Sequence, residues 1–304
     1  NTASGKMLFQ NYCNLTLDGV KVLGGTSCEY VMSNNNGSCT IKNSTVTATE
    51  GNCAFDVYYW SAGGYPEGVT VTVDNSIING HVKFGGQRSS DDTSMKGKLI
   101  IQGTNTVMNG NLVVTEGYYD ETNPNILISG GTFSDPSALA YLTDNADVNV
   151  NFTGDTELAQ TIIVPKGNVI IDLGEHTLTT ASTATEFNNK VTAIAVKDGA
   201  TATVKNGYIG DDSASMLYGV YADGEAKVML KNVHFSDRVT YAYNGKGILD
   251  AISCTFRGWL SGWHHDSTFD GCTFTIGKEW YPAAICYGST TFSNCKFFKN
   301  DTDA

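Results

Sequence analysis

Arginine is nearly absent from this chain, whose 304 residues include only Arg88, Arg238 and Arg257. Lysine and arginine together number 19 against 31 aspartates and glutamates, which gives a formal net charge of −12. A field of this sign repels phosphate backbones and anionic membrane surfaces. We therefore expect no nucleic-acid partner, and no polyanionic sugar unless a bound cation bridges it. The net charge does not exclude neutral glycans as partners.

Long apolar runs and prolines are also scarce. No stretch approaches the ~18 consecutive apolar residues that a membrane-spanning helix needs, so the sequence predicts no transmembrane segment. Five prolines stand against 33 glycines, and asparagine, threonine and serine are abundant, which is typical of turns between β-prone stretches. No basic and apolar leader follows Asn1, so we expect any targeting signal to have been removed or to lie outside this sequence.

One short phrase recurs along the chain, made of an alternating apolar pair, a polar or glycine corner, and a second alternating pair. Successive copies start 18 to 33 residues apart, except for one gap of about 43. Examples are LTLDGVKV at 15–22, VTVDNSII at 71–78, ATVKNGYI at 202–209 and TTFSNCKF at 290–297.

This alternation predicts short strands with one buried face, and the corner bends the chain without a hairpin reversal. Repeats of this kind stack their strands in parallel, coil on coil. The sequence therefore predicts an all-β fold, a parallel β-helix of roughly 11–12 coils. An antiparallel sandwich or barrel would prefer tight Asn-Gly hairpins every 8–12 residues, and these do not recur.

The strongest internal boundary lies near 135–150, where the phrase spacing jumps and PSALAYLTDN (136–145) carries the one helix-compatible pattern. We expect a first set of coils over 1–140 and a second set over 141–304, stacked on the first.

The eight cysteines contain no C-x-x-C pair, which gives no support to a zinc ribbon or a thioredoxin-type centre. Their even number permits disulfides in an exported protein, with pairings that the sequence does not assign. Cys254, Cys272 and Cys295 follow the corner in three successive phrases, where Val20 and Val233 stand in others. We expect these three to form a column of buried thiols that behave as small hydrophobic side chains.

Two sets of segments resemble known families. Asp172-Leu173-Gly174-Glu175-His176-Thr177-Leu178, within 156–180, resembles the opening coil of right-handed parallel β-helices of the pectin-lyase-like superfamily, with Glu175 in place of the usual glycine. The resemblance implies a right-handed coil and a structural role for His176. Segments 30–48, 53–60 and 126–138 resemble large repetitive uncharacterised surface proteins of gut bacteria, which implies a secreted or cell-surface location.

That superfamily includes lyases, hydrolases and adhesins, so activity must be argued from residues. The chain lacks the Gly-His-Gly and Arg-x-Lys motifs of polygalacturonase-like hydrolases. A pectate-lyase-like site needs carboxylates that hold Ca²⁺ and a basic residue that takes the α-proton of a uronate. Asp237, Arg238 and Arg257 fall at matching phases on adjacent coils, although a surface ion pair would give the same pattern.

The most unusual composition lies at 257–282, which holds three of the four tryptophans. Exposed indoles offer flat apolar faces to sugar rings, and histidine and aspartate can bind hydroxyls. In the alternative interpretation, large aromatics merely shield the late coils. Adjacent histidines of an extended strand point oppositely, so we predict no metal site. The expected ligand-binding residues are Trp259, Trp263, His264, His265, Asp266, Trp280 and Tyr281.

The sequence thus predicts a non-catalytic adhesion or glycan-binding module that contacts an extracellular glycan or a host or bacterial surface protein. It predicts no cofactor; Ca²⁺ would enter only with the lyase. The alternatives are a polysaccharide lyase or glycoside hydrolase that acts on an extracellular glycan, and a purely structural spacer.

Overall fold

The computed structural model describes residues 7–185, 191–211, 216–262, 265–275, 283–284 and 288–299. Most of them lie in short parallel strands. The helical segments within these ranges are two 3₁₀ helices, Ser61–Gly63 and Pro136–Tyr141. The second falls inside the helix-compatible segment of the sequence. Among the described residues, no helix has the length and apolar character that a membrane crossing requires.

The chain forms two compact units, Asn1–Val148 and Asn149–Ala304, and β15 (Leu142–Asn151) contains the boundary between them. In both units, each coil contributes one strand before the corner and a second after it. A further strand of the coil lies in a separate sheet. The predicted stacking of the second set of coils on the first stays a prediction.

In unit 1, the separate sheet has five strands and is called sheet A. Sheet A consists of β1 (Phe9–Asn11), β4 (Tyr30–Asn34), β7 (Cys53–Tyr59), β10 (His81–Gly86) and β13 (Leu112–Val114). The strands before the corner are β2 (Leu15–Asp18), β5 (Gly37–Lys42), β8 (Val69–Asp74), β11 (Gly97–Gln102) and β14 (Ile126–Phe133), which also continues past it. The short strands after the corner are β3 (Lys21–Leu23), β6 (Thr45–Thr47), β9 (Ile77–Asn79) and β12 (Val107–Asn109).

In unit 2, the separate sheet has six strands and is called sheet C. Sheet C consists of β17 (Ile162–Val164), β20 (Thr192–Val196), β22 (Met216–Ala222), β24 (Val239–Gly245), β27 (Trp259–Ser261) and β30 (Ala283–Ala284). The strands before the corner are β15, β18 (Asn168–Asp172), β21 (Thr201–Ile209), β23 (Lys227–Phe235), β25 (Ile248–Ile252), β28 (Ser267–Asp270) and β31 (Thr290–Ser293), of which β21 and β23 continue past it. Those after the corner are β16 (Thr156–Gln160), β19 (Thr177–Thr185), β26 (Thr255–Phe256), β29 (Thr273–Thr275) and β32 (Lys296–Phe298).

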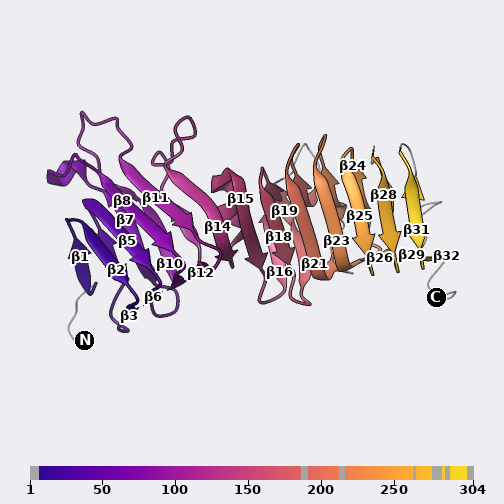
Figure 1. The fold of residues 1–304 in the computed structure, drawn as a ribbon, viewed down its shortest axis with the longest axis horizontal. Coiled ribbons are helices and arrows are strands. Elements are labelled where there is room, and N and C mark those ends of the chain that lie inside the picture. The colour runs from indigo at the N-terminus through magenta and orange to yellow at the C-terminus, as the bar shows by residue number, and fades with distance from the viewer. Residues whose placement is uncertain are drawn as a thin grey trace. The chain divides into compact units, whose positions relative to one another are not determined.

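Parallel pairing in register builds the core. In unit 1, Ile41, Val73, Ile101 and Ile128 pair across β5, β8, β11 and β14 and are fully buried. Figure 1 shows these strands side by side. Each coil covers its apolar residues with the next coil, so the core grows by stacking. The predicted all-β parallel β-helix is confirmed, and the five pre-corner strands of unit 1 with the seven of unit 2 agree with 11–12 coils.

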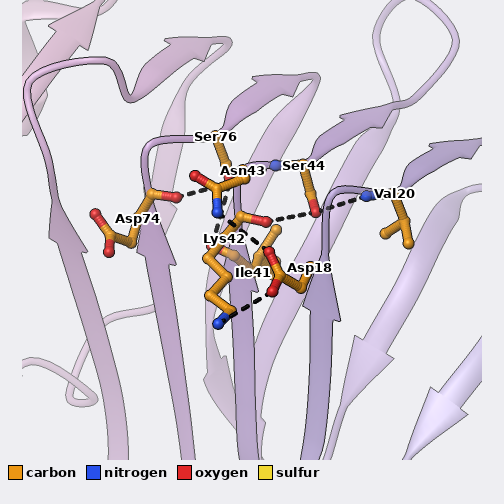
Figure 2. Close-up of polar contacts among 8 residues, drawn as sticks. All are labelled: Asp18, Val20, Ile41, Lys42, Asn43, Ser44, Asp74 and Ser76. Atoms are coloured by element: carbon orange, nitrogen blue, oxygen red, sulfur yellow. Dashed lines mark hydrogen bonds and ion pairs between the residues drawn. The ribbon is translucent and has the colours of Figure 1, made fainter.

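The corner is a left-handed residue between two strands. Asn43 and Asn75 take φ values of 51° and 45°, a region that asparagine and glycine enter more easily than other residues. The Asn43 amide N–H donates to the Asp74 carbonyl at 3.1 Å, and its side chain donates to Asp18 Oδ1 at 3.1 Å. Figure 2 shows these bonds from coil to coil. Asn206, Asn232, Ser253 and Asn294 repeat the conformation at later corners.

This geometry makes Asn43→Ala destabilising although the side chain is exposed. Alanine loses the bond to Asp18 and enters the left-handed region at a cost of ~1–2 kcal/mol, so we expect the free energy of unfolding in urea to fall by about that amount. Asn43→Gly is the matched control, because it loses the same bond but tolerates the backbone angle. Equal stability of the alanine and glycine variants would contradict this explanation.

The residue after the corner carries a second ladder of hydrogen bonds. In unit 1, Ser76 Oγ lies 2.9 Å from the Asp74 carbonyl and 3.2 Å from the Ile41 carbonyl, which share its one O–H proton. It also accepts the Ser44 amide N–H at 3.0 Å. Ser44 Oγ in turn accepts the Val20 amide N–H at 3.1 Å (Figure 2). One hydroxyl per coil therefore satisfies backbone groups of its own coil and of the preceding one.

Cysteines take this place in the late coils. Cys272 Sγ lies 3.5 Å from both the Asp270 and Ala251 carbonyls, and Cys295 makes the equivalent contacts with Ser293 and Phe269. The predicted buried thiols are confirmed for Cys254 and Cys272, whereas Cys295 is partly exposed. The thiols act as serine equivalents as well as filling space. All seven cysteines in the described residues are free, and Cys286 lies outside those residues.

Candidate functional site

An aromatic ladder crosses the strands of sheet C. Tyr218 of β22 pairs in register with Tyr241 of β24, and Tyr241 pairs with Trp259 of β27. Their ring centroids are 5.4 Å and 5.1 Å apart, close to the ~4.8 Å spacing of neighbouring strands. Tyr221 adds a fourth ring, 5.6 Å from Tyr218. We call Tyr218, Tyr221, Tyr241 and Trp259 the aromatic ladder.

The ladder lies on the outer side of the sheet. Val220, Tyr243 and Leu260 pair along the same three strands and are fully buried in the core, whereas all four ladder residues are partly exposed. The sequence thus gives each coil one side chain for the core and one aromatic side chain for the surface.

A column of polar side chains lies next to the aromatic ladder on the same strands. Tyr221, Asn244 and Ser261 form the next column of the same register, and Asn244 Nδ2 donates to Ser261 Oγ at 2.7 Å. Burial and then the neighbouring Asp223 carboxylate, to which the Tyr221 hydroxyl donates a hydrogen bond, raise the pKa of Tyr221. Lys197 Nζ balances Asp223 Oδ2 at 3.6 Å.

The rings do not form one flat platform. The interplanar angle is 54° between Tyr218 and Tyr241 and 68° between Tyr241 and Trp259. Trp259 therefore meets Tyr241 edge to face, and Tyr218 is tilted against Tyr241, so the three rings do not share a plane. Such a surface suits repeated shallow contacts with an extended ligand rather than enclosure of a small one.

Of the predicted ligand-binding residues, Trp259 lies in the ladder. His265 Nε2 lies 3.5 Å from Glu225 Oε2, and Asp266 Oδ1 accepts the Ser289 amide N–H at 2.7 Å, so each has a contact with another turn. The binding roles of these two residues stay predictions. Trp263, His264, Trp280 and Tyr281 lie outside the described residues.

The ligand-binding residues predicted from the sequence do not include Tyr218, Tyr221 and Tyr241. The available signal was a tyrosine-rich stretch after each of two phrases, MLYGVYA at 216–222 and VTYAYNG at 239–245. These stretches form β22 and β24, the two strands that precede β27 in the order of sheet C.

The residues of the predicted lyase site lie on turns that lead into sheet C. Asp237 and Arg238 precede β24, Arg257 precedes β27, and all three are exposed. The described residues contain no group of three or more histidines, cysteines, aspartates or glutamates that could hold a metal ion.

The motif at 172–178 forms a corner. Gly174 and Glu175 take φ values of 59° and 66°. Glu175 therefore occupies a left-handed position that favours glycine, the residue usual at this place in the phrase that the motif resembles. The His176 amide N–H donates to the Leu173 carbonyl at 2.9 Å, and its Nδ1 lies 3.8 Å from Asp155 Oδ1.

A scan of protein-family models found no match to this chain, and searches of curated proteins and of solved structures found none either.

Proposed function

We propose that the chain is a non-catalytic glycan-binding module and that the aromatic ladder is its contact surface. The observation that carries the proposal is the in-register series Tyr218, Tyr241 and Trp259, with rings one coil apart. A sugar ring has an apolar C–H face and a rim of hydroxyls. The rings offer apolar surface to the first, and the column of Tyr221, Asn244 and Ser261 offers hydrogen bonds to the second.

The direction of the ladder selects the shape of the ligand. Because the rings follow one another across the strands of sheet C, a ligand that touches all of them must be a chain of several units. The net charge of −12 favours an uncharged chain. We therefore assign a neutral oligosaccharide or polysaccharide as the ligand.

The cellular context of the proposal comes from resemblance. The pectin-lyase-like phrase at 172–178 and the segments similar to gut-bacterial surface proteins support a bacterial adhesin that is secreted or held at the cell surface. Its partner is an extracellular glycan or a glycan-bearing surface protein of the host or of another bacterium.

A polysaccharide lyase or glycoside hydrolase is the second candidate, because Asp237, Arg238 and Arg257 are exposed on the turns that precede two neighbouring ladder strands. An array of extracellular polysaccharides, read for binding and then for products by mass spectrometry, separates the candidates. We expect binding of at least one neutral glycan without cleavage. Depolymerised product would establish the enzyme instead, and the absence of binding across the array would leave only the spacer.

A further inference from the structure

We propose that the outer face of sheet A in unit 1 is a second, separate binding site for a neutral sugar. Its centre is Asp56 on β7, which pairs in register with Ser33 on β4 and Lys83 on β10. The alternate column, Met32, Phe55 and Val82, fills the core. Asp56 therefore points away from the core, and yet only 7% of it is exposed.

Hydrogen bonds hold the Asp56 carboxylate in place. Ser33 Oγ donates to Oδ2 at 3.0 Å, and the Asn34 amide N–H donates to Oδ1 at 2.9 Å. The Asn34 side chain donates to the Asp56 carbonyl at 3.0 Å. Each carboxylate oxygen accepts one of these bonds and has a further lone pair, so the group can still accept a hydroxyl from a ligand.

An aromatic cluster lies where two strands of sheet A end, since Tyr12 follows β1 and Trp60 follows β7. Tyr12, Trp60 and Tyr65 form a cluster with ring centroids 4.9 to 6.3 Å apart, and all three are partly exposed. The pairing of Asn11 with Asn34, and of Asn34 with Val57, sets Tyr12 near the level of Asp56 along the strands. Burial first, and then Tyr65 and Asp56, raise the pKa of Tyr12. Tyr58 stands two residues beyond Asp56 on the same strand.

Lys83 completes the face. Its Nζ donates to the Tyr30 hydroxyl at 3.1 Å and lies 4.9 Å from the centre of that ring. The pair of one carboxylate and one ammonium gives the face no net charge, so it selects neither anions nor cations. Fixed acceptors and donors beside aromatic rings match the hydroxyls and the apolar face of a neutral sugar.

The site carries its own pH dependence. Burial raises the pKa of Asp56 to about 6, against the opposing effects of the bonds from Asn34 and Ser33 and of Lys83. The other titratable groups on this face are Tyr12, Tyr30, Tyr58, Cys53 and Lys83, and burial raises the pKa of Tyr12, Tyr58 and Cys53. A sugar hydroxyl that donates to ionised Asp56 competes with a proton, so binding weakens as the pH falls below about 6.

The test uses the full chain with Tyr241→Ala and Trp259→Ala, so that the aromatic ladder does not contribute. Glucose, galactose, mannose and N-acetylglucosamine are the probes in saturation-transfer NMR at pH 7.5 and 5.0. We expect at least one to bind, about tenfold more weakly at pH 5.0, and Tyr12→Ala to remove the signal. Asp56→Asn should abolish the pH dependence.

A ¹³C titration of the Asp56 carboxyl with and without the sugar keeps the test decisive if Asp56→Asn does not fold, because a bound sugar must lower that pKa. The proposal is overturned by an absence of saturation transfer from all four sugars, by an affinity that does not change with pH, or by stronger binding of glucuronate. None of these results bears on glycan binding by the aromatic ladder of unit 2. The second site and the proposed function are therefore tested separately.

Discussion

Replacing Trp259 with alanine is expected to weaken glycan binding at least tenfold while the protein stays folded. Trp259 packs its ring against Tyr241 at 5.1 Å on the outer side of sheet C, and tryptophan is the residue type that most often dominates a binding surface. A tenfold change corresponds to about 1.4 kcal/mol of binding free energy. Titration calorimetry with the glycan identified on the array measures it.

Two controls make this result specific. Tyr241→Phe keeps the ring and should retain most of the affinity, whereas Tyr241→Ala should lose it. Tyr208→Ala removes another aromatic side chain of unit 2, which is 44% exposed and stacked on His234 but belongs to β21, outside sheet C. An equal loss of affinity from Tyr208→Ala would contradict the assignment of binding to the ladder.

The largest expected effect on stability comes from Phe274→Ala. Phe274 is fully buried and stacks on Phe256 at 5.1 Å and on Phe297 at 4.7 Å. Truncation leaves a cavity between coils and should cost ~3–5 kcal/mol, a large part of the ~5–15 kcal/mol that a typical domain has. Urea unfolding followed by circular dichroism measures the loss.

Phe297→Ala is the matched control for Phe274→Ala. The two residues pair in register on β29 and β32, but 53% of Phe297 is exposed. Since less of its surface is removed from water, its truncation should cost clearly less. If the two variants lost equal stability, the stacked phenylalanines would not be the core of these coils.

The fold could be predicted because each phrase specifies its own geometry. Alternation in VTVDNSII fixes which residues of β8 and β9 face the core, and Asn75 supplies the left-handed corner between them. The cysteine column followed from the same phase. Its hydrogen bonds could not be predicted, because they require the carbonyls of the preceding coil.

The ladder could not be read from the phrases. Tyr218, Tyr241 and Trp259 stand nine, six and three residues after Ile209, Phe235 and Phe256, the last residues of their phrases. The number of intervening residues falls from coil to coil, so equal positions in the strand register have unequal positions in sequence. Only the strand register brings the three rings together.

The burial of Asp56 could not be predicted from the sequence for a different reason. Asp56 stands among apolar residues in CAFDVYYW (53–60), a pattern that predicts an exposed position for the one charged residue of the strand. Its near-complete burial depends on side chains from other coils, Ser33 and Asn34 among them. Such a covering cannot be inferred from one strand.

Hydroxyl-radical footprinting of the protein with and without its array-selected glycan tests the central claim most directly. We expect the glycan to reduce oxidation of Tyr218, Tyr241 and Trp259 together, to leave Tyr208 unchanged, and to remain uncleaved in the same sample. Protection confined to other residues, or conversion of the glycan to shorter products, would contradict a non-catalytic aromatic ladder.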